Sequence, residues 1–190
     1  MKRSIPYTGL IVILAASFPL ATAFAASDLS VAAHEKAGIM RSTQEDLAPH
    51  SIMVSSALRG TRVAVDGLAS QIATDPTPAS PLSKQHIEIY RAELAQDLKT
   101  ADTHRNELEG AIVKYPDLAK SSEYRDLISA IDDVDHARAG LDYKIQSDSW
   151  LVNKDQAQAD LKDFKKKLDH AIDKTSNFNS KKLKAQTSFG

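Results

Sequence analysis

The sequence predicts an all-α protein: an antiparallel bundle of four to five long helices with coiled-coil-like packing, after a cleaved signal peptide. Three observations lead to this prediction. Apolar residues recur at steps of three and four along most of the chain, which is the spacing of one helix face. Only 6% of the residues are aromatic, which suits helices with an aliphatic core. The chain contains no cysteine, so packing rather than disulfides must stabilise it.

The N-terminal segment has the features of a secretory signal peptide. Lys2 and Arg3 give it a positive start, and an uncharged, largely apolar run continues to Ser27. The small residues that a signal peptidase requires predict cleavage between Ala25 and Ala26, an uncleaved membrane anchor being the alternative. We therefore expect a bacterial periplasmic protein. Because no cysteine can carry a lipid, we do not expect a lipoprotein.

Beyond the signal peptide, residues 1–25, the sequence predicts one helical domain over 26–176 and a flexible basic tail over 177–190. A proline-rich linker at 75–81 lies inside the domain. Removing the signal peptide changes the formal charge from −1 to −3, which excludes the dense positive surface typical of nucleic-acid binders. Lysines concentrate near the C-terminus, so contact with a membrane is expected only through the tail.

The clearest helix is predicted between two prolines. Ser80 can cap this helix and Pro81 suits its first position, whereas Pro116 ends it. Its apolar residues keep a coiled-coil-like spacing, with Arg105 at the one polar position. This seam consists of Ile87, Tyr90, Leu94, Leu98, Ala101, Leu108, Ile112 and Tyr115.

Two further helices follow with the same spacing. One runs from about residue 117 or 121 to 147, and Arg138 interrupts its apolar stripe. The other follows Asn153, which forms a predicted capping box with Gln156. The stripes comprise Tyr124, Leu127, Ile131, Val134, Leu141 and Ile145 in the first helix, and Ala157, Leu161, Phe164, Leu168 and Ile172 in the second.

The N-terminal half of the domain is less regular. Apolar positions predict helices over 28–47 and 50–74, with Pro49 between them. A proline suits the first turn of a helix but removes a hydrogen bond from a helix interior. Two alternatives therefore remain: two separate helices, or one long helix kinked at Pro49.

A short segment has a counterpart in a known family. Tyr115-Pro116-Asp117-Leu118 resembles the Tyr-Pro-Asp-Leu segment that opens a helix in the LemA family of membrane-associated helical proteins. The likeness covers less than a tenth of the chain. It implies the start of a helix after Tyr115 and carries no function across.

Histidine and methionine are the residues best suited to a metal or a haem. His50-x-x-Met53 pairs an imidazole with a thioether, a combination that suits copper, and His34 and Met40 precede it. The same ligand types suit a noncovalent haem. These four residues are therefore the first candidate site.

Asp133 and His136 form a second candidate metal pair. They lie in an acidic stretch and off the predicted core stripe, so a solvated helix face explains them better than a metal site does.

The sequence contains no recognisable catalytic motif. It lacks a Gly-x-Ser-x-Gly elbow, a glycine-rich phosphate loop and a His-Glu-x-x-His pair. We therefore predict a noncatalytic protein without a cofactor, which binds or protects against envelope stress through its surface. Its partner would be an unidentified protein or a second copy packed along the apolar seam. The alternative is a periplasmic metal-binding or haem-binding bundle with His and Met ligands.

Overall fold

Every element in the described part of the chain is helical. The computed structural model describes residues 21–74, 81–145 and 153–184, without the side chains of 21–34, 81–83 and 145. The chain forms two compact units, Met1–Gly38 and Ile39–Gly190, and the bundle belongs to the second. The elements are α1 (Ala21–Thr74), α2 (Pro81–Ile112), the one-turn α3 (Pro116–Ala119), α4 (Ser122–Ile145), α6 (Lys154–Phe178) and the π-helical η1 (Asn179–Leu183).

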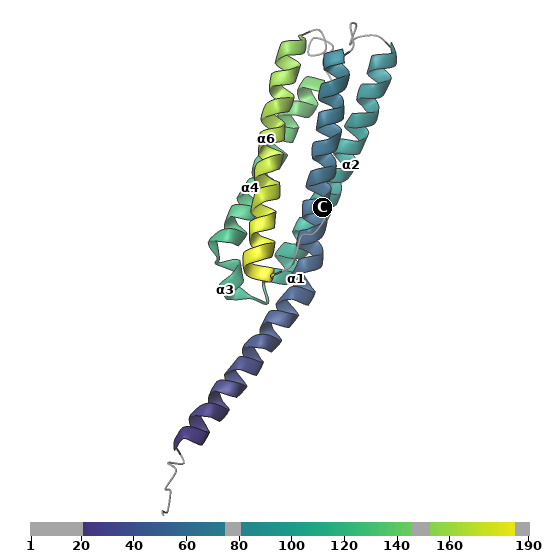
Figure 1. The fold of residues 1–190 in the computed structure, drawn as a ribbon. Helices are drawn as coiled ribbons and strands as arrows, with labels where there is room; N and C mark the ends of the chain where they lie inside the picture. The colour runs from purple at the N-terminus through teal and green to yellow at the C-terminus, as the bar shows by residue number, and fades with distance from the viewer. Residues whose placement is uncertain (1–20, 75–80, 146–152, 185–190) are drawn as a thin grey trace, which may run out of the picture. The chain divides into compact units, whose positions relative to one another are not determined.

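Within the second unit, residues 39–74 of α1 lie side by side with α2, α4 and α6, and each helix is antiparallel to the one before it (Figure 1). Ion pairs join neighbouring helices around the bundle, in the order α1, α2, α4, α6. They include Arg105–Asp132 between α2 and α4 (2.6 Å), Lys144–Asp160 and Lys174–Asp126 between α4 and α6 (2.8 and 2.9 Å), and Arg62–Asp169 and Lys165–Asp66 between α6 and α1 (2.6 and 2.5 Å). The predicted all-α bundle is confirmed.

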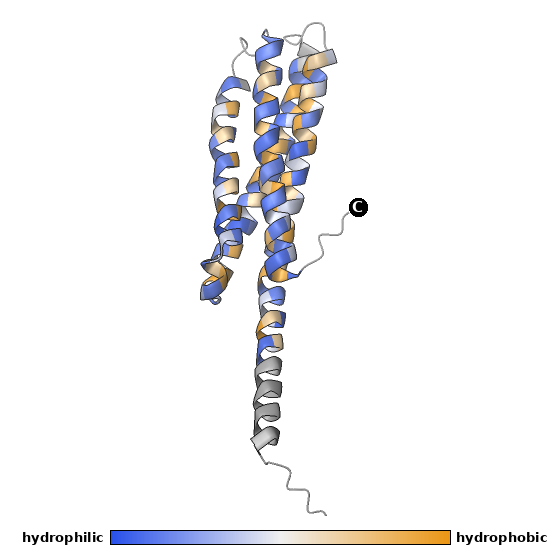
Figure 2. Ribbon diagram, turned by 60° about the vertical axis from the view of Figure 1, so that its left-hand side comes forward, coloured by the Kyte–Doolittle hydropathy of each residue, from blue (hydrophilic) through white to orange (hydrophobic). Residues whose placement is uncertain are grey.

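Burial follows the predicted apolar stripes. In Figure 2 the hydrophobic residues lie mainly between the helices and the hydrophilic residues mainly on the outward faces. The α2 seam is buried against its own chain, so it does not present an apolar face to a second copy. Its residues Ile87, Leu94, Leu98, Ala101, Leu108 and Ile112 are all at most 3% exposed, and Tyr90 and Tyr115 are partly buried.

Arg105 occupies the polar position of the α2 seam. Its side chain is 19% exposed, and its guanidinium reaches Glu109 at 2.9 Å, Asp132 at 2.6 Å and Asp135 at 3.4 Å. A charge at this depth is tolerated when carboxylates pair with it. Because Asp132 and Asp135 belong to α4, the one charged residue of the seam joins α2 to α4.

α1 is a single helix that runs through Pro49, which decides between the two alternatives left open by the sequence. Proline cannot donate a hydrogen bond to the carbonyl of Glu45, four residues earlier. Both Pro49 and Glu45 are exposed, so water can hydrogen-bond to that carbonyl. The surface position of the proline explains why the helix continues.

The start of α6 agrees with the predicted cap. Asn153 Oδ1 accepts a hydrogen bond from the backbone N–H of Gln156 at 3.2 Å. The side chain of Gln156 donates to Asp160. The cap is therefore present, while the Gln156 side chain binds along the helix.

Residues 177–183 are helical, which corrects the flexible tail predicted from their lysines. Phe178 is fully buried and Leu183 is 3% exposed, and Lys182 pairs with Glu123 at 3.1 Å. Burying an apolar side chain of this kind stabilises the fold by about 1.5–3 kcal/mol. The two apolar residues therefore hold the end of the chain on the bundle as far as Lys184, where φ is 49°.

Parts of the predicted organisation fall outside the described residues. Of the predicted signal peptide the structure describes only the helical backbone of 21–25, and neither Ser80 nor residues 185–190 are described. No helix in the described part of the chain is long and apolar enough to cross a membrane.

The close approach of α1 and α2 generates a stability prediction. A Cβ at Gly67 would collide with the ring of Tyr90, whereas a Cβ at Gly140 on α4 would meet open space. Gly67→Ala should destabilise the protein by about 1–3 kcal/mol because the ring must move. Gly140→Ala should stabilise it by about 0.5–1 kcal/mol through helix propensity. Urea unfolding of both variants measures the difference, and equal effects would contradict this packing.

Candidate metal centre

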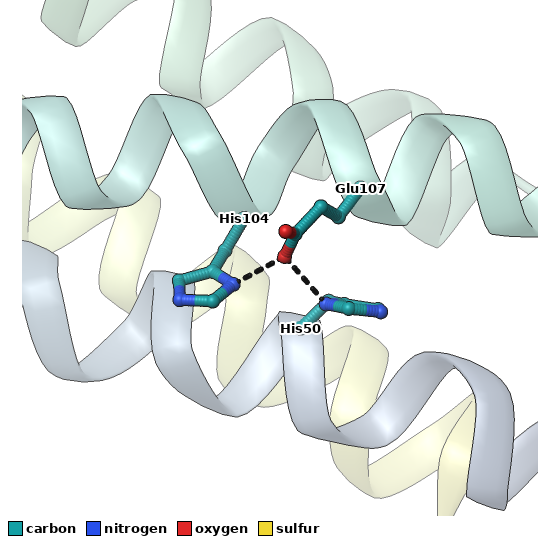
Figure 3. A group of neighbouring side chains, drawn as sticks. All are labelled: His50, His104 and Glu107. Carbon is teal, nitrogen blue, oxygen red and sulfur yellow. Dashed lines mark hydrogen bonds and ion pairs between the residues drawn. The ribbon is translucent and has the colours of Figure 1, made fainter.

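Three side chains that are distant in the sequence converge between α1 and α2. His50 projects from α1, and His104 and Glu107 project from α2 (Figure 3). One carboxylate oxygen, Glu107 Oε2, lies 2.9 Å from His50 Nδ1 and 2.6 Å from His104 Nδ1. The two imidazole rings are 6.0 Å apart between centroids and tilted by 32°. Two ring nitrogens therefore converge on one carboxylate oxygen.

The pairing of α1 with α2 places these residues opposite one another. The Cβ positions of Gly60 and Gly67 on α1 abut Asp97 and Tyr90 on α2. Each step forward on α1 is matched by an equal step backward on α2, as in any antiparallel pair. The same register continues to His50, which faces Glu107. The glycines allow the two helices to approach closely at the centre of the pair, and the histidines lie nearer one end of it.

The geometry of the cluster suits a transition-metal ion. One ligand atom from each of the three residues lies within 4.8 Å of the others. Metal–nitrogen and metal–oxygen bonds of about 2.0–2.2 Å place the ligands of a tetrahedral ion about 3.3 Å apart. The observed separations of 2.6 and 2.9 Å therefore need to widen by about 0.7 and 0.4 Å to reach this value. The side chains are 24–45% exposed, which leaves them free to make this adjustment.

The ligand types narrow the class of ion. Imidazole suits Zn²⁺, Cu²⁺, Ni²⁺ and iron, whereas Mg²⁺ and Ca²⁺ prefer oxygen ligands alone. Two imidazoles and one carboxylate therefore favour a borderline transition metal. Three protein ligands also leave at least one coordination position open.

A second polar link lies one helical turn before His50. Asp46 on α1 accepts hydrogen bonds from Lys114 Nζ at 3.1 Å and from the Tyr115 hydroxyl at 3.0 Å. The hydrogen bond from Lys114 holds the pKa of the Asp46 carboxyl below its ordinary value, and the bond from Tyr115 adds to the effect. This link fastens the turn that follows α2 to α1, beside the histidine cluster.

The first candidate set from the sequence does not form one site. Met40 and His50 lie on the same helix, ten residues and therefore about 15 Å apart. Met40 is 40% exposed beside the turn that holds Tyr115. The side chain of His34 lies outside the described residues. Of that set, only His50 belongs to the cluster with His104 and Glu107, and Met53 follows it by one turn.

The second candidate pair has an ordinary surface environment. Asp133 and His136 are both exposed on α4, and His136 Nδ1 lies 2.7 Å from the backbone oxygen of Asp132. Among the described residues, the only group of three or more possible metal ligands is the one formed by His50, His104 and Glu107.

His104 and Glu107 were not identified from the sequence as ligands. The local signal was His104-x-x-Glu107, which places both side chains on one face of a helix. His50 lies 54 positions before His104, and no spacing rule connects the two. Only the register between α1 and α2 brings the third ligand to the pair.

Comparisons with protein-family models, with curated proteins and with solved structures found no match.

The Asp46 link predicts a pH-dependent contribution to stability. Because its pKa is lowered in the folded state, Asp46 stabilises the fold above the pKa of the unfolded chain and loses this effect as the pH falls through the folded-state pKa. Asp46→Asn should therefore destabilise the protein at about pH 7, by an amount that shrinks as the pH approaches about 3. Chemical denaturation at both pH values measures the change.

The exposed Asp133 provides the control for this experiment. Asp133→Asn should leave the free energy of unfolding nearly unchanged at both pH values. A loss for Asp46→Asn that does not depend on pH would show that the charge of the carboxylate is not what stabilises the fold.

Proposed function

We propose that this protein is a noncatalytic helical bundle that binds one transition-metal ion through His50, His104 and Glu107. The observation that carries the proposal is the convergence of two imidazole nitrogens on a single carboxylate oxygen, from two different helices. This is the metal-binding alternative of the sequence analysis, with a different set of ligands.

The accessibility of the cluster favours exchangeable binding over catalysis. All three side chains are partly exposed, so an ion can enter and leave without opening the bundle. Catalytic metal sites commonly sit where water can be excluded around the substrate, and a site on the flank of two helices offers little shielding. A carrier, buffer or sensor of metal ions fits this arrangement.

Metal binding should also fasten α1 to α2. The ion would replace a carboxylate shared by two imidazoles with three coordinate bonds that join the helices. An ion that binds only the folded state stabilises it by about 2.7 kcal/mol at a hundred times its Kd. The free energy of unfolding of the bundle would therefore rise as the ion binds.

Isothermal titration with Zn²⁺ and Cu²⁺ tests the proposal. We expect one ion per chain, and an affinity at least about tenfold weaker in His50→Ala and in His104→Ala, because each variant loses a ligand. Saturating metal should raise Tm in the unmodified protein and not in these variants. His136→Ala is the matched control, since this exposed histidine lies on α4 outside the cluster. Equal affinities in all four proteins, or no binding, would refute the proposed site.

We further propose that the protein acts in the bacterial periplasm, after export and cleavage between Ala25 and Ala26. This proposal is supported by the positive charges of Lys2 and Arg3, by the uncharged run that follows them, and by the small residues at the predicted cleavage position. Expression with fractionation should recover the protein in the periplasmic fraction. Mass spectrometry should then find Ala26 at its N-terminus, and recovery of a chain that begins at Met1 would contradict the prediction.

A further inference from the structure

Met53 is a surface residue of α1. Its side chain is 41% exposed, whereas Val54 and Leu58 on the same helix are fully buried. Burial in the apolar core therefore does not account for its position. A flexible thioether at the surface, one turn from a candidate ligand, is available for another role.

The spacing along α1 places Met53 on the stripe that faces α2. Positions 46, 50, 53, 57, 60, 64 and 67 follow one another at steps of four and three, which keeps them on one helix face. Four members of this stripe contact α2 or the turn that follows it. Asp46 binds Tyr115, His50 binds Glu107, and Gly60 and Gly67 abut α2 side chains. Met53 lies between them.

The register then identifies the residue opposite Met53. Position 50 faces 107, position 60 faces 97 and position 67 faces 90. Each advance along α1 is matched by an equal retreat along α2, so the register is constant over these positions. Position 53 therefore faces 104. His50 and Met53 on α1 lie opposite Glu107 and His104 on α2, each pair separated by three residues. Side chains at this spacing have Cβ atoms about 5–6 Å apart on a helix, within reach of the long methionine side chain.

We propose that Met53 is a further ligand of the metal centre and makes it selective for copper in the Cu⁺ state. This inference rests on the proposed function, and it identifies the ion. Thioether is a soft ligand that favours Cu⁺, and imidazole binds copper in both oxidation states. His50 and His104 with Met53 form a set for Cu⁺, while the carboxylate of Glu107 completes a set for Zn²⁺ or Cu²⁺.

Two substitutions separate these ligand sets. Met53→Leu keeps the volume and removes the sulfur, so the affinity for Cu⁺ should fall at least about tenfold while that for Zn²⁺ stays within about twofold. Glu107→Gln should have the opposite effect, lowering the affinity for Zn²⁺ more than the affinity for Cu⁺. Competition with chromophoric chelators, under anaerobic conditions for Cu⁺, measures both affinities on the purified full chain.

Met40→Leu is the matched control. Met40 is the other exposed methionine of α1, 40% accessible and thirteen residues before Met53, which is about 20 Å along the helix. This variant should bind both ions as the unmodified protein does. Circular dichroism of every variant verifies that the helices are intact before the affinities are compared.

X-ray absorption of the Cu⁺-loaded protein provides a direct readout. We expect a copper–sulfur shell that Met53→Leu abolishes and Met40→Leu retains; because the chain lacks cysteine, no thiolate can supply that sulfur. The role of Met53 would be overturned if the protein binds Zn²⁺ but its copper spectrum shows no sulfur. It would also be overturned if the protein binds Zn²⁺ and Met53→Leu leaves the affinity for Cu⁺ unchanged. Either result would leave the three-residue site standing. Failure of the protein to bind any of these ions would refute the proposed function itself.

Discussion

The constant register of α1 against α2 is the constraint on which the candidate metal centre depends. Gly67 and Gly60 let the ring of Tyr90 and the carboxylate of Asp97 lie where side chains of α1 would otherwise stand. Helices packed this closely cannot slide without a clash, so the contact sets which residues meet further along the pair. His50 is brought to Glu107 by this packing.

The same packing explains how polar groups are distributed in the bundle. Arg105 lies in the apolar seam of α2 because α4 supplies Asp132 and Asp135 to pair with it. His50 and Glu107 lie on the flank of the α1–α2 pair, where they are partly hydrated. A charged group near the core needs fixed partners, whereas groups on the flank can exchange one partner for another. The flank is therefore where exchangeable binding is expected.

The proposed function and the role of Met53 make different demands on this flank. Binding of Zn²⁺ needs only the two imidazoles and the carboxylate, which are in contact in the structure. Selectivity for Cu⁺ also needs the thioether of Met53 as a ligand, and an exposed, unbranched side chain changes its rotamer at low cost. The packed helices fix the positions of the ligands, and the exposed side chains can change rotamer to suit the ion.

The sequence by itself determined the helical class, the α2 seam with Arg105 at its polar position, and the Asn153 cap, because these depend on neighbours within a few residues of one another. Single-helix continuity through Pro49 and the burial of Phe178 were decided by tertiary structure, since both depend on which faces meet solvent. The candidate metal centre is likewise determined partly by the sequence and partly by the tertiary structure. His104-x-x-Glu107 is visible in the sequence, but its junction with His50 required the register of two helices, which no local pattern encodes.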